Sequence, residues 1–217
     1  MKSKLIQSGI ALAALLAAPF AAQAADLSPS PAYKAPSYVA PVFTWSGFYV
    51  GGNIGYGFGD AKWTAPSVSS KPKGFLGGLT WGYNLQTGIW VWGIEGDLDY
   101  SAAKGSVACG GVTCTLKDQW FGTARGRIGY AGWNNFMPYF TGGAAFADLK
   151  ASAGALQKTD WRIGWTIGGG VEYALWSNWS VKGEYLYADL GKETCCGAGR
   201  SVTYTTNIVR TGLNYRF

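Results

Sequence analysis

The sequence predicts an all-β fold: an eight-stranded antiparallel up-and-down β-barrel that crosses a membrane. Three observations predict it: an aromatic and glycine-rich composition, eight segments of alternating polarity, and connections that alternate between short and long. The 217 residues include 33 Gly, 11 Trp, 13 Tyr and 10 Phe, whereas only 14% are charged and His is absent. Aromatic residues favour strands, and glycine disfavours helices.

The N-terminal segment predicts export. Lys2 and Lys4 precede an apolar run over residues 10–20, and the segment ends in Ala-Gln-Ala. This layout is typical of a secretory signal peptide, predicted here as residues 1–24. The apolar run is too short to be a membrane anchor, since a helical span needs roughly 20 residues.

The rest of the chain predicts a leader followed by one domain. Residues 25–42 hold four prolines among Ala, Ser and Tyr, which predicts an extended periplasmic leader. Residues 43–217 have the length of a single barrel domain. The net charge is +6, but the basic side chains are scattered, so a nucleic-acid partner is not expected. The uncharged stretches 35–59 and 74–94 are too rich in glycine and amides to resemble membrane helices.

Eight segments predict membrane-spanning strands. In each of them large apolar side chains alternate with small or polar ones, as in a strand whose two faces meet different environments. Each is about 10 residues or longer, enough for a tilted strand to cross a bilayer. The segments lie near residues 48–58, 75–84, 90–100, 120–130, 136–149, 161–173, 179–187 and 209–217. In the fifth segment the sequence leaves open which positions face which side.

The connections between these segments alternate in length. Short connections are predicted near residues 86–88, 132–134 and 176–178, and long ones at about 59–73, 102–117, 150–158 and 191–202. Short periplasmic turns that alternate with long extracellular loops are typical of a membrane barrel, with the N-terminus in the periplasm.

The apolar face of each strand is predicted to point outward. The interior of an eight-stranded barrel is only just wide enough for side chains to fill, and rows of aromatic rings would overpack it. Aromatic residues near the strand ends should then form two girdles at the membrane interfaces. These are Trp90, Tyr100, Trp120, Tyr130, Trp161, Tyr173, Trp179 and Tyr187.

The inward positions carry charges of both signs in nearly equal number. The acids are Glu95, Asp97, Asp99, Glu172 and Glu184, and the bases are Arg125, Arg127, Arg162, Lys182, Arg210 and Arg216. Charges removed from bulk water must be paired, and the guanidinium group suits carboxylates. We therefore predict an interior ion-pair network that largely plugs the lumen. The alternative is a narrow, charge-lined path for ions or small hydrophilic solutes.

Three motifs carry a resemblance to a known family. They are WSGFYVGGN at residues 45–53, GIEGDLDY at 93–100 and RTGLNYRF at 210–217. The chain resembles the small porin-like and "immunogenic" outer-membrane proteins, which are similar in architecture to the OmpA transmembrane barrel and to OmpX. The resemblance covers about residues 43–217 and implies a place in the outer membrane of a Gram-negative bacterium. It implies a structural and surface-interaction, antigen-like role, with a small low-conductance porin as the alternative.

The C-terminus carries a second part of this resemblance. Phe217, preceded by Leu213 and Tyr215 at alternate positions, resembles the signal that the barrel-assembly machinery reads. The alternative is that Phe217 is simply the last residue of an aromatic girdle.

The four cysteines, Cys109, Cys114, Cys195 and Cys196, fall in predicted long loops. An even number of cysteines in an exported protein suggests disulfides, and all three pairings stay open. Metal binding is the weaker alternative because His and Cys-x-x-Cys motifs are absent. No metal and no cofactor is predicted.

The chain is predicted not to be an enzyme. General acid–base catalysis near neutral pH most often uses histidine, which this chain lacks. Glu95, Asp97 and Asp99 stand at alternate positions on one face and could form a paired-carboxylate site. We expect them to pair with the inward arginines instead.

Basic side chains are scattered over the predicted long loops. Near the barrel rim they could meet outer-membrane lipid and the phosphates of lipopolysaccharide, and the alternative is an ordinary solvated surface. They are Lys62, Lys71, Lys73, Lys104, Lys117, Lys150, Lys158, Lys192 and Arg200.

Overall fold

The computed structural model describes residues 43–217 except 65–66, 110, 134, 154–155, 177 and 195–200. The predicted signal peptide and leader, as well as Cys195, Cys196 and Arg200, lie outside these residues. Among the described residues, no helix is long and apolar enough to cross a membrane.

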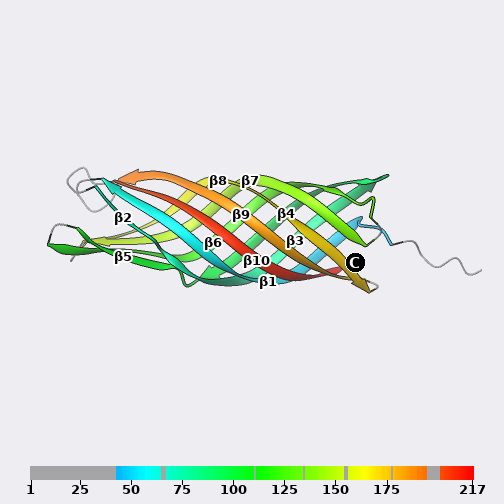
Figure 1. The fold of residues 1–217 in the computed structure, drawn as a ribbon, viewed down its shortest axis with the longest axis horizontal. Coiled ribbons are helices and arrows are strands. Elements are labelled where there is room, and N and C mark those ends of the chain that lie inside the picture. Colours follow the sequence, from blue (N-terminus) through cyan, green and yellow to red (C-terminus); the bar gives the residue numbers. More distant parts are fainter. Residues whose placement is uncertain are drawn as a thin grey trace, which may run out of the picture. The chain divides into compact units, whose positions relative to one another are not determined.

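The described chain forms one antiparallel sheet that closes into a ring (Figure 1). Going round the ring, the order is β1–β10–β9–β8–β7–β6–β4–β3, and β3 pairs with β1 to close it. These eight strands confirm the predicted up-and-down barrel. Their bounds are β1 (Gly47–Thr64), β3 (Lys73–Thr87), β4 (Trp90–Ser101), β6 (Val112–Tyr130), β7 (Phe136–Ala153), β8 (Leu156–Trp176), β9 (Trp179–Thr194) and β10 (Ser201–Arg216).

Two short strands extend the ring at its outer end, the end away from the chain's C-terminus. β2 (Val68–Ser70) pairs with β1, and β5 (Lys104–Cys109) pairs with β6. In the chain, two residues separate β2 from β3, and two residues separate β4 from β5. The two short strands therefore continue the barrel wall beyond those breaks.

The prediction of four long loops is wrong over most of their length. β1 runs on to Thr64, β7 runs to Ala153, and β8 begins as early as Leu156. Alternation continues there, but its polarity is reversed: Ala61 and Trp63 are buried, whereas Lys62 and Thr64 are exposed. In the sequence this reversal resembles the end of a strand. A wall that meets water on its outside must bury its apolar residues within.

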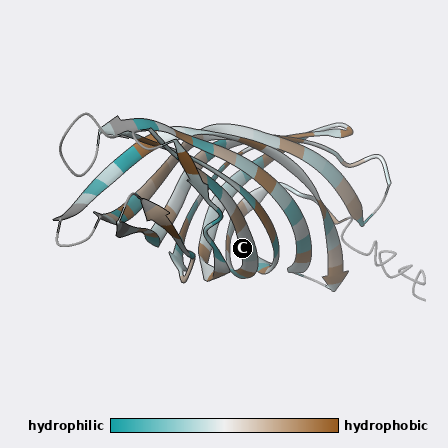
Figure 2. Cartoon of the chain, turned by 60° about the vertical axis from the view of Figure 1, so that its left-hand side comes forward, coloured by the Kyte–Doolittle hydropathy of each residue, from teal (hydrophilic) through white to brown (hydrophobic). Residues whose placement is uncertain are grey.

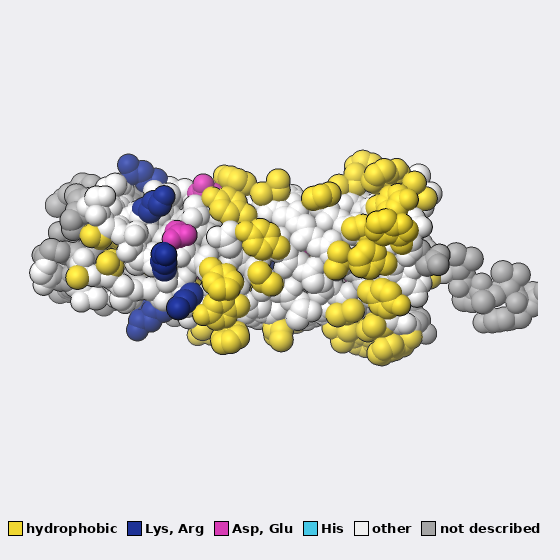
Figure 3. Space-filling model, in the orientation of Figure 1, with side chains coloured by type: hydrophobic (Ala, Val, Ile, Leu, Met, Phe, Trp, Pro, Cys, Tyr) yellow, Lys and Arg dark blue, Asp and Glu magenta, His cyan; other side chains and the backbone are white. Residues whose placement is uncertain are grey.

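In the membrane segment the apolar face points outward, as predicted. The large outward side chains are strongly exposed, for example Ile54 at 69%, Phe75 at 74% and Ile163 at 73%. Figure 2 shows hydrophobic and hydrophilic residues alternating along the strands, and Figure 3 shows two bands of hydrophobic side chains on the visible face. All eight predicted girdle residues are at least partly exposed.

Aromatic pairs across neighbouring strands mark the two girdles. Trp90 contacts Tyr130 at the inner row, with 5.7 Å between ring centroids, and Tyr100 contacts Trp120 at the outer row, with 5.6 Å. The membrane segment of the barrel lies between these two rows, and we call the part beyond the outer row the outer segment.

The structure also settles the facing of β7. Met137, Tyr139, Thr141 and Ala145 are buried inside, whereas Phe140 is 76% exposed. Residues 142–145 are Gly-Gly-Ala-Ala, so small side chains occupy both faces at the centre of this strand. That is why the sequence pattern alone could not decide its phase.

Candidate functional site

The centre of the barrel holds a buried network of ion pairs. β4 contributes three carboxylates at alternate positions, and the residue opposite Glu95 on the neighbouring strand β6 is Arg125. Because strand side chains alternate between faces, this register sends both groups into the lumen. Each network residue is at most 6% exposed. The members are Glu95, Asp97, Asp99, Arg125, Arg127, Glu172, Lys182, Glu184, Arg210 and Arg216.

Arg125 joins carboxylates from two strands that are not neighbours. Its Nη2 lies 2.5 Å from an oxygen of Glu95 and 2.8 Å from one of Asp97, both on β4. Its Nη1 lies 2.9 Å from Glu184 on β9. The Nε group donates to the Thr123 hydroxyl at 2.7 Å. A single guanidinium therefore bridges the lumen.

Arg210 on β10 makes a second bridge beside the first. Its Nη1 lies 2.9 Å from Asp99, and its Nη2 lies 2.9 Å from Asp97 and 3.3 Å from Glu184. Asp97 and Glu184 thus each receive both guanidinium groups. Charge-assisted hydrogen bonds of this kind are stronger than neutral ones.

Toward the inner aromatic row, the network continues through Glu95 and Glu172. Glu95 accepts hydrogen bonds from Lys182 at 2.9 Å and from the Tyr49 hydroxyl at 2.7 Å. Glu172 lies 2.7 Å from Arg127 and accepts a hydrogen bond from Ser180 at 2.6 Å.

The ten described members carry five negative and five positive charges. Their charges cancel, and they fill the cross-section of the barrel from β4 to β10.

An apolar cluster closes the inner end of the interior, the end that holds the chain's C-terminus. Its buried members are Trp45, Val91, Met137, Tyr139 and Ala174. Arg216 links this cluster to the network: its guanidinium lies 4.8 Å from the Trp45 ring centre and 3.9 Å from Glu172. The residues just before β1 therefore cover the inner mouth.

A larger apolar core fills the outer segment and extends past the outer aromatic row to Phe121, Ala145 and Ala147. Its members come from most of the strands and pack in the same lumen that holds charges in the membrane segment. They are Ala61, Trp63, Leu76, Cys114, Leu116, Phe121, Ala145, Ala147, Leu149, Ala151, Leu186, Ala188, Leu190, Val202, Tyr204 and Ile208.

Arg162, the remaining predicted member of the network, is buried and faces inward. It follows Trp161 on β8, on the membrane side of that outer girdle residue, and lies opposite Ala147 on β7. Its Nη1 donates to the carbonyl oxygen of Val202 at 3.3 Å. The alternation of the sequence assigned its face correctly, and its membership of the network stays a prediction.

Asp118 is a buried carboxyl that the sequence analysis missed. It lies on β6 beyond Trp120, in the outer segment, and is 5% exposed. The pKa of Asp118 is raised to about 7, chiefly by burial; a hydrogen bond with Ser101 opposes the shift, and the carboxylates of Asp148 and Asp99 add to it. Strict alternation from the outward Trp120 would have placed Asp118 on the outward face, and the register irregularity between these two residues brings it inside.

The remaining predicted site residues have separate positions. Cys114 is buried in the outer segment and is disulfide-bonded, but the side chains of the other cysteines lie outside the described part, so the pairing stays a prediction. Phe217 is 69% exposed and its ring lies 5.8 Å from that of Phe48, and its role as an assembly signal likewise stays a prediction. Within the described ranges, no group of three or more His, Cys, Asp or Glu could hold a metal ion.

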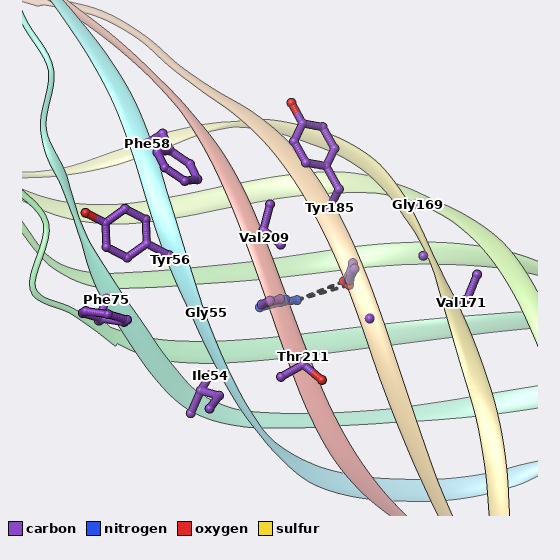
Figure 4. Close-up of a pocket in the computed structure, with 14 residues that line it drawn as sticks. Ile54, Gly55, Tyr56, Phe58, Phe75, Gly169, Val171, Tyr185, Val209 and Thr211 are labelled. Carbon is purple, nitrogen blue, oxygen red and sulfur yellow. Dashed lines mark hydrogen bonds and ion pairs between the residues drawn. The ribbon is translucent and has the colours of Figure 1, made fainter.

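A depression of about 900 Å³ lies on the lipid-facing wall rather than in the lumen (Figure 4). Gly169 and Thr211 form part of its floor, and Phe58, Phe75 and Tyr185 stand at its edges. Such an apolar surface suits lipid chains. It offers no catalytic constellation, because the charged groups behind the wall are engaged in the interior network.

Comparisons with known proteins agree with this architecture. The sequence profile of the outer membrane protein beta-barrel domain matches residues 10–217. The 31 kDa outer-membrane immunogenic protein of Brucella melitensis is 36% identical, with 100% of both chains covered. The 25 kDa outer-membrane immunogenic protein of Brucella abortus is 37% identical, with 100% of this chain and 99% of that protein covered.

Solved structures share the fold at low sequence identity. OprG from Pseudomonas aeruginosa has a TM-score of 0.54 at 15% identity and covers 79% of this chain and 97% of its own. Neisserial surface protein A has a TM-score of 0.51 at 17% identity, with 79% and 98% covered. These similarities concern the fold alone.

Proposed function

We propose, from the premise that the chain belongs to the outer membrane protein beta-barrel family, that it is a closed barrel with a structural and surface-interaction role in the cell outer membrane. One observation carries this proposal: the lumen is filled in three successive layers. An apolar cluster, a charge-balanced network and an apolar core follow one another from the periplasmic to the extracellular end.

Each layer opposes ion flow for a different reason. An ion that enters the network must displace a paired partner and leave a buried charge uncompensated, which costs several kcal/mol. The outer core is largely apolar and offers an ion few polar groups to replace its hydration shell. The porin alternative needs a path that avoids all three layers.

The engaged state of the carboxylates supports a role without catalysis. Asp97 and Glu184 each contact two guanidinium groups, and Glu95 contacts Arg125, Arg127 and Lys182. A general base needs an accessible carboxylate or imidazole, and the sequence contains no histidine.

The proposal is tested by single-channel recording of the refolded protein in a planar bilayer, with heat-modifiable gel mobility as proof of folding. We expect no unitary current steps. Reproducible steps whose ion selectivity changes in an Arg125→Gln variant would replace the closed barrel by a small porin.

A further inference from the structure

Four lysines on adjacent strands form a continuous row across the outer segment. Lys73 on β3 faces Lys104 on β5, Lys104 faces Lys117 on β6, and Lys117 faces Lys150 on β7. All four side chains are exposed on the outside of the barrel. We call these four residues the lysine row.

The lysine row lies just beyond the outer aromatic girdle. Trp120 of that girdle pairs with Asp148, and Lys150 follows two residues further along β7. Two residues correspond to roughly 7 Å along a strand. Figure 3 shows basic side chains gathered beyond the outer hydrophobic band on the visible face. At this height the outer leaflet carries its headgroups.

The four positive charges of the row favour the binding of an anionic ligand. Like charges directly opposite each other on neighbouring strands are destabilising. Among the described residues, none of the four ammonium groups has an ion pair, and the outward carboxyl nearest along β7 is Asp148. Neighbouring strands lie about 4.8 Å apart, so the row spans roughly 15 Å. A ligand with several phosphates would neutralise more than one lysine.

We infer that the lysine row binds the lipid-anchored phosphate groups of lipopolysaccharide at the outer leaflet. This inference deepens the proposed surface role and rests on the barrel's place in the outer membrane. Lysine binds phosphate as a point charge. The row would hold one glycolipid against the wall formed by β3, β5, β6 and β7, directly above the lipid-facing aromatic side chains.

The test compares two triple variants of the refolded barrel. Lys104→Gln, Lys117→Gln and Lys150→Gln together remove three members of the row, and Lys62→Gln, Lys71→Gln and Lys192→Gln together serve as the matched control. The control removes equal charge from the outer segment, but Lys62 and Lys192 are separated by Thr203 and form no row. Binding of fluorescent lipopolysaccharide is measured in detergent micelles.

We expect the row variant to lose roughly tenfold or more in affinity and the control less than about twofold. Dephosphorylated lipopolysaccharide should bind weakly to the wild type and show no difference between variants. Equal losses in both variants, or unchanged binding after dephosphorylation, would overturn the inference.

Two soluble anions distinguish lipid-bound phosphate from other ligands. Inorganic phosphate and heparin should bind the wild type more weakly than lipopolysaccharide does. If either anion bound as tightly as lipopolysaccharide and its binding also depended on the lysine row, the assignment of the ligand as lipid-bound phosphate would be overturned. If this inference fails, the proposed closed barrel still stands, because the row variant should still fold and pass no current. A conducting wild type would overturn the closed barrel without changing the binding result.

Discussion

The membrane segment and the outer segment of the barrel share one backbone pattern and have opposite polarity. Between the girdles, the outside is apolar and the inside holds ion pairs such as Arg125 with Glu95. Beyond the outer girdle, the inside is apolar around Leu149 and the outside carries the lysine row. In both segments, successive side chains alternate between the inside and the outside of the barrel. What differs is the solvent on the outside of the wall.

The difference teaches that the surroundings set the content of the lumen. In lipid, apolar residues gain nothing by turning inward, so the interior can take polar groups provided that they satisfy one another. In water, the hydrophobic effect drives apolar residues into the lumen. Irregularities in register lie near this transition, between Asp118 and Trp120 and between Thr203 and Thr205.

Removal of Arg125 should have the largest effect on stability. Arg125→Ala leaves Glu95, Asp97 and Glu184 short of a cationic partner in a dry lumen, so we expect a loss of about 3–5 kcal/mol in the free energy of unfolding. Urea unfolding followed by tryptophan fluorescence measures it. Lys117→Ala, an exposed cation on the same strand, is the control, and an equal loss there would contradict the network's importance.

The outer core is expected to depend on packing instead. Leu149→Ala should cost about 2–5 kcal/mol, because it opens a cavity among buried apolar side chains. Its neighbour Lys150, which faces outward, should tolerate Ala within about 0.5 kcal/mol. The same unfolding assay compares the two. Similar effects at both positions would mean that the outer segment is not a packed barrel.

The effect of an added charge on stability should depend on whether lipid or water surrounds the outward face of the barrel. Ile94 is 69% exposed between the girdles, and Ile94→Arg should destabilise the barrel by about 2–4 kcal/mol in lipid vesicles. Thr113→Arg, at an exposed position of the outer segment, should change stability by less than about 0.5 kcal/mol. A reversal of this order would misplace the membrane boundary.

Acid should stabilise the outer segment slightly through Asp118. The pKa of this carboxyl is about 7 in the folded protein, above its ordinary value of 3.8, so the folded state binds the proton more tightly. Its contribution is fully present below about pH 4 and is lost as the pH rises to about 7. Unfolding measured from pH 4 to 8 should show this trend, and Asp118→Asn should flatten it. An unchanged profile in Asp118→Asn would assign the trend to other groups.

Much of the membrane segment could be predicted from sequence because its two faces differ strongly in size and polarity. The facing of Glu95, Arg125 and Arg210 followed from alternation alone. The depth of each side chain along the barrel did not follow, because it depends on the register between strands. Trp45 escaped notice as an interior residue, since aromatic side chains in this chain mostly face lipid.

The outer segment was missed for a related reason. Lysine and threonine at outward positions resemble loop composition when each position is considered separately. Only the buried partners of these residues, such as Trp63 and Leu116, show that the chain remains a strand. The pattern had inverted at the membrane boundary, and the prediction assumed a single environment throughout.

The outer segment continues the barrel wall beyond the outer girdle as hydrogen-bonded sheet. From Asp148 to Ala153, β7 rises five residues beyond the girdle, roughly 16 Å along the strand, while bonded to β6 and β8. A foreign peptide inserted between Ala153 and Leu156 would therefore be held away from the bilayer by hydrogen-bonded sheet and not by a flexible linker. The barrel could serve as a display scaffold whose cargo height is set by strand length.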